Sequence, residues 1–148
     1  MTDAIIVADN DSLMRGILRS ILIGMDQTVM LATCGEEVLA LARRQRAKLF
    51  LLDLDMPRLN GLVTCERLRA SPSHSETPIA ILTALGGEPT RRAAARVGAT
   101  LFLSKPIRPA TLMQALSPYL GVTAIPGLPP ARVVDGATGA GSAGERAR

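Results

Sequence analysis

The sequence predicts an α/β fold in which a parallel sheet of five strands is covered by helices on both faces. Five short apolar runs alternate with segments whose apolar residues recur at helical spacing. Each run is apolar throughout, as in strands that are buried on both faces of a parallel sheet. The five predicted strands are residues 4–8, 28–32, 48–52, 79–83 and 99–104.

Start and stop signals place the first two helices. The first helix follows the first strand and reaches a stop signal at Gly24. After the second strand, Thr33 and Glu36 match a capping box, which predicts that the second helix starts there. The apolar positions of the first helix, three and four residues apart, are Leu13, Met14, Ile17, Leu18, Ile21 and Leu22.

Three more helices follow the remaining strands. The third is predicted over residues 62–69. The fourth has Pro89 in its first turn and Gly98 after its end, and its run of alanines buries little apolar surface. We therefore expect it to be weakly anchored and to respond to a chemical signal. The last helix is predicted over residues 109–120.

The length of 148 residues is sufficient for one domain, which we assign to residues 1–121. Residues 122–148 are rich in Gly, Ala and Pro and have few large apolar side chains to offset the cost of ordering, which predicts a disordered tail. Residues 109–131 carry no charge, but four prolines interrupt them, so no membrane span is expected.

Composition argues against direct nucleic-acid binding, because the net charge is only +4 and aromatic residues make up 2% of the chain. Cys34 and Cys65 form no CxxC motif, and we interpret them as reduced thiols. With no secretory signal at the N-terminus, the sequence predicts a cytoplasmic protein. His74 lies in a polar loop, where we expect it to be exposed and without a role.

Acids, a hydroxyl and an ammonium follow the ends of four predicted strands. In open parallel sheets, ligands bind beyond the carboxyl ends of the strands, so these groups should meet at one edge. Oxygen ligands of this kind suit Mg²⁺, and a hydroxyl and an ammonium beside it would bind a phosphoryl group, which indicates phosphoryl transfer to a carboxylate. The groups are Asp9, Asn10, Asp11, Asp53, Asp55, Thr83, Ser104 and Lys105.

Four motifs at these positions, "VADND", "DLDMPRLNG", "LTA" and "FLSKP", resemble the receiver domain of two-component response regulators over residues 3–121. The single-domain type, represented by the chemotaxis response regulator, is the most similar. The resemblance implies a flavodoxin-like (βα)5 fold with strand order 2-1-3-4-5. It also implies a protein that catalyses only its own phosphorylation and dephosphorylation, and is not otherwise an enzyme.

The resemblance assigns roles residue by residue. The acceptor precedes Met-Pro by three and four positions, which identifies Asp53 and not Asp55. The implied Mg²⁺ ligands are Asp9, Asn10, Asp53 and the backbone carbonyl of Asp55. The implied phosphate-binding and switch residues are Thr83, Ala84, Phe102 and Lys105, with Asp53 and Lys105 as the catalytic pair and a cis bond before Pro106. Packing remains an equal alternative for Phe102, and a helix cap is the preferred interpretation of Asp11.

The chain departs from the family pattern at Asn10, where a second acid is usual. Two unit charges about 4 Å apart interact by roughly 4 kcal/mol at an effective dielectric near 20, before desolvation is subtracted. We therefore expect weakened Mg²⁺ binding, with Asp9 and Asp53 as the anionic ligands and partial compensation by Asp11 and Asp55.

Three functions are compared. The first is a stand-alone receiver that takes a phosphoryl group from a histidine kinase or histidine phosphotransfer protein and acts on an unknown downstream protein. Its expected contact is the face of the fourth helix, fifth strand and fifth helix, which could also form a homodimer. The second is a pseudo-receiver that is not phosphorylated, supported by Asn10. The third is a haloacid-dehalogenase-type phosphatase, supported only by the Asp53-Leu54-Asp55 spacing.

Overall fold

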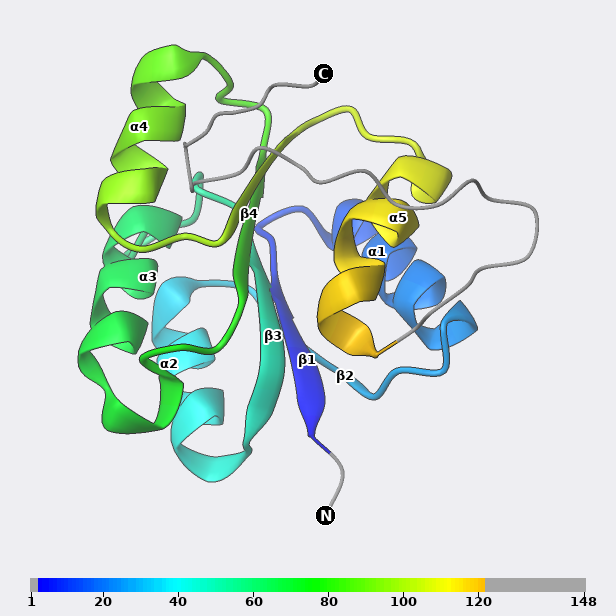
Figure 1. Ribbon diagram of the computed structural model, residues 1–148, viewed down its shortest axis with the longest axis horizontal. Coiled ribbons are helices and arrows are strands. Elements are labelled where there is room, and N and C mark those ends of the chain that lie inside the picture. The colour runs from blue at the N-terminus through cyan, green and yellow to red at the C-terminus, as the bar shows by residue number, and fades with distance from the viewer. Residues whose placement is uncertain (1–2, 122–148) are drawn as a thin grey trace.

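The computed structural model describes residues 3–121; residues 1–2 and the predicted tail at 122–148 lie outside the described residues. Within residues 3–121, strands and helices alternate as predicted (Figure 1). The strands are β1 (Ala4–Ala8), β2 (Val29–Ala32), β3 (Ala47–Leu52), β4 (Ile79–Thr83) and β5 (Leu101–Ser104). The helices are α1 (Ser12–Gly24), α2 (Gly35–Arg44), α3 (Gly61–Ala70), the short 3₁₀ turn η1 (Pro72–His74), α4 (Glu88–Arg96) and α5 (Pro109–Leu120).

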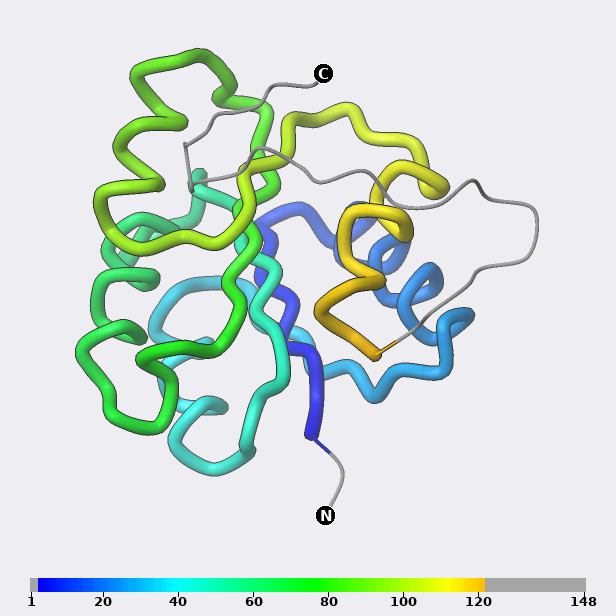
Figure 2. Tube along the Cα trace, in the orientation of Figure 1, coloured from blue at the N-terminus to red at the C-terminus, as the bar shows by residue number. Residues whose placement is uncertain are grey.

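The five strands form one parallel sheet in the order β2-β1-β3-β4-β5, which confirms the predicted topology. At its centre, Ile6 of β1 is in register with Met30 of β2 and Phe50 of β3. The chain path in Figure 2 returns through a helix between successive strands, as parallel pairing requires. All five strands therefore end at the same edge.

Two apolar layers bury the sheet, one on each face. Successive residues of a strand point to opposite faces, so Phe50 faces one layer and its neighbours Leu49 and Leu51 face the other. The Phe50 layer lies under α2, α3 and α4, and the other layer lies under α1 and α5 (Figure 1). Burial on both faces explains why the strands are apolar without interruption.

The first turn of α1 is capped as expected, because the Asp11 carboxylate accepts a hydrogen bond from the backbone N–H of Leu13 at 3.0 Å. The apolar stripe of α1 is wider than the sheet covers. Leu18 and Leu22 are buried, whereas Leu13 is 71% exposed and Ile17 is 44% exposed. An apolar strip of α1 therefore faces outward.

The predicted capping box at α2 is displaced by one residue. The backbone N–H of Thr33 donates to the carboxylate of Glu37 at 2.7 Å, not to Glu36, and the N-cap residue is Cys34. A Cβ on Gly35 would overlap the hydroxyl of Thr64 on α3, so the close approach of α3 requires glycine at the first residue of α2.

His74 is buried, so the prediction of an exposed, inert side chain is wrong. It is 3% exposed, and its ring packs edge-on against Phe50 with centroids 5.1 Å apart. Nε2 lies 3.3 Å from the carbonyl oxygen of Ala42 and therefore carries the hydrogen, because a carbonyl only accepts. Nδ1 then accepts from the hydroxyl of Thr77 at 3.2 Å. Although the neighbouring residues in the sequence are polar, the His74 side chain is buried and connects η1 to α2 through its hydrogen bond to Ala42.

Both cysteines are free and buried, in agreement with their interpretation as reduced thiols. Burial raises the pKa of Cys65 to about 11, so this thiol stays protonated at neutral pH. In the part of the chain that the structure describes, no helix has the length and apolar character needed to cross a bilayer.

Candidate functional site

Backbone hydrogen bonds continue the sheet past its strands and fix the first residues of the candidate site. The N–H of Asp53 donates to the carbonyl of Ala8 at 3.0 Å, so Asp53 lies beside Asp9 at the carboxyl edge. The N–H of Lys105 donates to the carbonyl of Thr83 at 2.8 Å and holds the end of β5 beside the end of β4. The backbone hydrogen bonds between neighbouring strands thus bring side chains that are distant in sequence to the same edge of the sheet.

One ammonium joins the two acids at this edge. Lys105 Nζ lies 2.7 Å from Oδ2 of Asp9 and 3.2 Å from Oδ2 of Asp53. The side chains are 17%, 2% and 8% exposed, respectively. Charge-assisted hydrogen bonds at such distances are strong, and burial limits their screening by salt. Asp9, Asp53 and Lys105 therefore meet at this edge of the sheet, as the sequence predicts.

The remaining carboxylate oxygens are held by the backbone. Oδ1 of Asp9 accepts from the N–H of Asp11 at 2.9 Å, and Oδ1 of Asp53 accepts from the N–H of Asp55 at 3.2 Å. Both oxygens of each buried carboxylate thus have a hydrogen-bond partner. These bonds offset the free-energy cost of burying the carboxylate. The site is oriented before any ligand arrives.

Two opposing effects act on the pKa of Lys105. Burial, the largest single effect, lowers it, but the hydrogen bonds and negative charges of Asp9 and Asp53 together raise it above the ordinary lysine value. Lys105 is therefore charged at neutral pH. Counting one ammonium against two carboxylates, the three side chains leave one negative charge in the pocket.

A second cation, Arg15, braces the loop after β1. Its Nη1 donates to the backbone carbonyl of Asp9 at 2.6 Å. Because this bond is to the main chain, Arg15 fixes the position of Asp9 without competing for its carboxylate.

The residues predicted to bind phosphate or to switch with it lie at or near the carboxyl ends of β4 and β5. Thr83 is fully buried, and its hydroxyl accepts from the N–H of Leu85 at 3.1 Å. Ala84, the next residue, is exposed. Phe102 is 9% exposed and packs in the layer under α2, α3 and α4, so the packing interpretation describes its position here. The peptide bond between Lys105 and Pro106 is cis, as the resemblance implied.

The oxygen ligands fit a magnesium ion, although less fully than in the usual pattern. Asp9 and Asp53 are buried carboxylates that share a single ammonium, an arrangement that leaves negative charge for a hard cation. Asn10 and Asp55 are exposed beside them. One oxygen of the Asp11 carboxylate, Oδ1, caps α1. Among residues 3–121, no three acidic, histidine or cysteine side chains gather closely enough to form a metal centre on their own.

Gly61, the last residue of the motif "DLDMPRLNG", lets the start of α3 approach the backbone of Asp53. A Cβ at Gly61 would lie 2.9 Å from Cα of Leu54 and would collide with the carbonyl oxygen of Asp53. The start of α3 therefore packs directly on the backbone of the acceptor candidate, with Asn60 capping the helix by accepting from the N–H of Val63 at 3.0 Å. The Asn-Gly pair before an apolar helix was the available signal.

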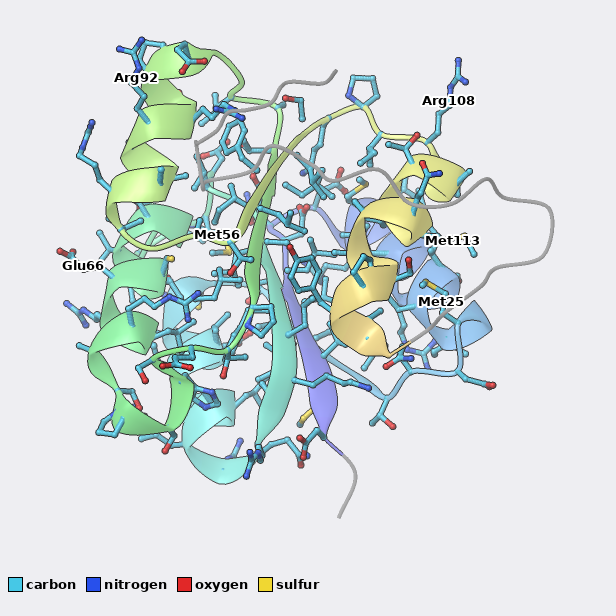
Figure 3. The ribbon with its side chains drawn as sticks, in the orientation of Figure 1. Met25, Met56, Glu66, Arg92, Arg108 and Met113 are labelled. Atoms are coloured by element: carbon cyan, nitrogen blue, oxygen red, sulfur yellow. The ribbon has the colours of Figure 1, made fainter. Side chains whose placement is uncertain are left out.

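A groove of about 390 Å³ adjoins the site on the side of α1. Lys105 and Ala84 line one end of it, and Ile17 and Met14 of α1 form its apolar wall. Further round the edge, the labelled side chains of Arg92 on α4 and Arg108 before α5 point away from the sheet (Figure 3). The approach to Lys105 from α1 is thus apolar, while basic side chains mark the outer surface.

Comparison with curated proteins finds a response regulator and an uncharacterized protein among the relatives. The chain is 36% identical over 118 residues to the cyclic di-GMP phosphodiesterase response regulator RpfG of Xanthomonas campestris pv. campestris, covering 78% of this chain and 31% of that protein. It is 34% identical over 115 residues to an uncharacterized 14.6 kDa protein of Leptolyngbya boryana, covering 78% of this chain and 88% of that protein. It thus spans about a third of RpfG, and activities of that whole protein do not transfer.

Solved structures agree. The chemotaxis response regulator CheY4 of Vibrio cholerae has a TM-score of 0.76 and 27% identity, over 80% of this chain and 99% of that one. The receiver domain of the sensor histidine kinase PA1611 of Pseudomonas aeruginosa PAO1 has a TM-score of 0.75 and 25% identity, over 82% and 99%. That structure has a magnesium ion coordinated in its active-site cleft.

The family model for the response regulator receiver domain matches residues 5–117, which is most of the chain. The matched range begins in β1, ends in α5 and includes every residue of the carboxylate and ammonium cluster. Receiver domains of two-component systems are signalling domains in which aspartate phosphorylation and Mg²⁺ are characteristic. With its fold, its site and this match in agreement, the chain belongs to the response regulator receiver domain family.

Proposed function

We propose that this chain is a phosphorylatable receiver that accepts a phosphoryl group on Asp53 from a histidine kinase or a histidine phosphotransfer protein. The observation that carries the proposal is the bridging position of Lys105, whose Nζ contacts both Asp9 and Asp53. An ammonium in this place neutralises charge on the attacking carboxylate and on an incoming phosphoryl group.

In the proposed reaction, a carboxylate oxygen of Asp53 forms a bond to phosphorus while the bond from phosphorus to the donor's ring nitrogen breaks. The electron pair of that bond goes to the imidazole nitrogen. The Asp55 N–H keeps the carboxylate oriented, and Lys105 turns from the acid to the new phosphoryl oxygens. Held by Asp9, Asn10, Asp53 and the carbonyl of Asp55, Mg²⁺ would add positive charge against those oxygens.

The groove beside Lys105 is the surface that we assign to the phosphodonor. A donor histidine has to reach Asp53 from outside the sheet edge, and this apolar hollow ends at Lys105 itself. Exposed apolar side chains on α1 supply contact area for a protein partner. The face of α4, β5 and α5, where Leu85 and Tyr119 are partly exposed, remains the proposed output or homodimer contact.

The acceptor is tested by incubating the protein with acetyl phosphate and Mg²⁺ and measuring the intact mass. We expect one phosphate adduct, which is absent in Asp53→Asn and retained in Asp55→Asn, the exposed carboxylate two residues away. An adduct that survives in Asp53→Asn would contradict the assignment. No adduct in the wild type would favour the pseudo-receiver, the alternative that Asn10 supports.

The donor surface is tested separately with Ile17→Ser. We expect slower transfer from a phosphorylated histidine phosphotransfer protein that serves the wild type, with an unchanged rate from acetyl phosphate. Ile23→Ser is the matched control, because Ile23 is equally exposed on α1, at 44%, but does not line the groove. Equal slowing in both variants would remove the groove from the proposal.

A further inference from the structure

A hollow of about 480 Å³ lies far from Asp53, between the C-terminal ends of α2 and α3 and the 3₁₀ turn η1. Helices α2 and α3 lie side by side on one face of the sheet and end near the edge where the strands begin (Figure 1). The residues that line the hollow are Leu39, Ala42, Arg43, Arg67, Leu68, Ser71, Ser73 and His74. Its volume falls within the range of small-molecule sites, about 300–1,000 Å³.

Two arginines and two serines, all of which can donate hydrogen bonds, line this hollow. Arg43 comes from α2 and Arg67 from α3, and within residues 3–121 neither guanidinium has an ion pair or hydrogen bond. Ser71 and Ser73 add hydroxyls from the turn. Among residues 3–121, no acidic residue lines the hollow, and the labelled Glu66 lies on the outer side of α3 (Figure 3). A ligand that matches two guanidinium forks is a multivalent oxyanion.

The floor of the hollow is apolar and rigid. Leu39 and Leu68 contribute aliphatic surface, and the His74 ring has both nitrogens occupied by Ala42 and Thr77. The ring therefore has no free hydrogen-bonding group, and with only 3% of His74 exposed it closes the base of the hollow. A flat or apolar group fits such a floor.

Arg69 braces this floor from behind. Its guanidinium donates to the carbonyls of His74 at 2.9 Å, Thr77 at 2.6 Å and Gly98 at 2.9 Å, and to the Thr100 hydroxyl at 3.2 Å. Burial lowers the pKa of Arg69, but arginine remains charged at neutral pH. All four hydrogen-bond acceptors are uncharged, and the negative charge of Glu76 acts on Arg69 as well, so Arg69 serves here to hold the backbone of the turn.

Helix dipoles alone do not explain the arrangement. The C-terminal ends of α2 and α3 carry partial negative charge, which favours arginine in the last turn. Arg44 satisfies that preference on the same turn as Arg43, yet it does not line the hollow. Arg43 and Arg67 differ from Arg44 in that both line the same hollow, together with Leu39 and Leu68.

We propose that this hollow is a second ligand site, which binds a small phosphate ester with a flat or apolar body, of mononucleotide size. The phosphate lies between Arg43 and Arg67, and the body lies against Leu39, Leu68 and the ring of His74. The site is independent of phosphorylation at Asp53.

The test uses AMP as probe on the full chain, with the amide of Ser73 and the imidazole of His74 followed by NMR. We expect saturable shifts at these two residues, with affinity reduced about tenfold or more in Arg43→Gln and in Arg67→Gln, because each removes a charge-assisted contact. Arg44→Gln is the control, and we expect it to change the affinity by less than about twofold. Unfolding curves of Arg43→Gln, Arg67→Gln and Arg44→Gln would verify that each variant is folded.

Adenosine and inorganic phosphate separate the two parts of the ligand. We expect each to bind more weakly than AMP. Equal affinity for inorganic phosphate would mean general attraction to basic surface, and equal affinity for adenosine would mean an apolar hollow without anion recognition. Either result, an equal effect of Arg44→Gln, or no saturable shift with AMP would overturn the proposal.

Discussion

Lys105 Nζ lies 2.7 Å from Oδ2 of Asp9, which makes this pair the tighter of the two contacts that the ammonium forms. The acceptor candidate Asp53 is at 3.2 Å. Lys105 is thus anchored mainly by Asp9, which is not the acceptor candidate. Its weaker contact is the one that must be exchanged when Asp53 is modified, so the anchor stays in place while the reacting carboxylate changes.

The first prediction concerns stability at alkaline pH. The folded state raises the pKa of Lys105, so it holds this proton more tightly than the unfolded chain. The stabilisation is complete below the ordinary lysine value of about 10.4 and is lost as pH rises through the folded value. In Lys105→Gln this part of the alkaline loss should disappear. Urea unfolding between about pH 9 and pH 12, which spans the onset of the loss near the ordinary lysine value, would measure it.

Lys48→Gln is the matched control for this measurement. Its Nζ donates to the neutral Oε1 of Gln27 at 3.0 Å, and the chain has no lysine besides these two. The pH profile of Lys48→Gln should follow the wild type. A Lys105→Gln profile that also follows the wild type would contradict the role of the ion pair.

The second prediction restores the missing acid. Asn10→Asp adds a carboxylate beside Asp9, and at an effective dielectric near 20 a charge about 4 Å away contributes roughly 4 kcal/mol before desolvation, so Mg²⁺ should bind at least about tenfold tighter. Calorimetric titration with Mg²⁺ would measure it. Asn10→Ala, which removes the amide oxygen without adding charge, should not tighten binding. Unchanged affinity in Asn10→Asp would place position 10 outside the ion's reach.

The third prediction tests close packing at the site. In Gly61→Ala the new Cβ meets the backbone of Asp53 and Leu54, so we expect destabilisation of about 1–3 kcal/mol and slower phosphorylation. Gly16→Ala is the counterpart within α1, where a Cβ has nothing within 4 Å, and we expect stabilisation of about 0.5–1 kcal/mol. Urea unfolding of both variants gives the comparison; a loss of similar size in both would rule out the contact as the cause.

The topology and the central cluster could be predicted because both depend on the edge of a parallel sheet. Asp9 and Asp53 come directly after buried strands, and Lys105 directly follows β5, so knowing the strands was enough to bring the three together. The same knowledge did not give the contact distances. The preference of Lys105 for Asp9 depends on side-chain packing that no motif encodes.

The residues that were misjudged are those whose environment comes from distant segments. His74 lies in a run of polar residues, and only the meeting of η1 with α2 and Phe50 buries it. The cap at Thr33 uses Glu37 instead of Glu36, and glycine at position 35 is required by Thr64, which lies on another helix. Local sequence patterns predict helices well, but they contain no information on packing contacts with elements that are distant in sequence.

The last prediction concerns Thr83 and the loop before α4. The Thr83 hydroxyl accepts from the N–H of Leu85, and of the nine residues of α4 only Ala94 is buried, so this segment has little packing to hold it. A phosphoryl group on Asp53 that draws this hydroxyl would release Leu85. Hydrogen exchange in residues 84–100 should therefore change on phosphorylation or on addition of a phosphate mimic.

Two variants at position 83 decide whether the hydroxyl transmits the change. Thr83→Ser keeps it and should retain the exchange response, whereas Thr83→Ala should still accept phosphate on Asp53 but lose most of the response. Intact mass would verify equal phosphorylation before exchange is compared. Because α4 is weakly anchored in every variant, a response of the same size in Thr83→Ala would show that the signal reaches α4 without this hydroxyl.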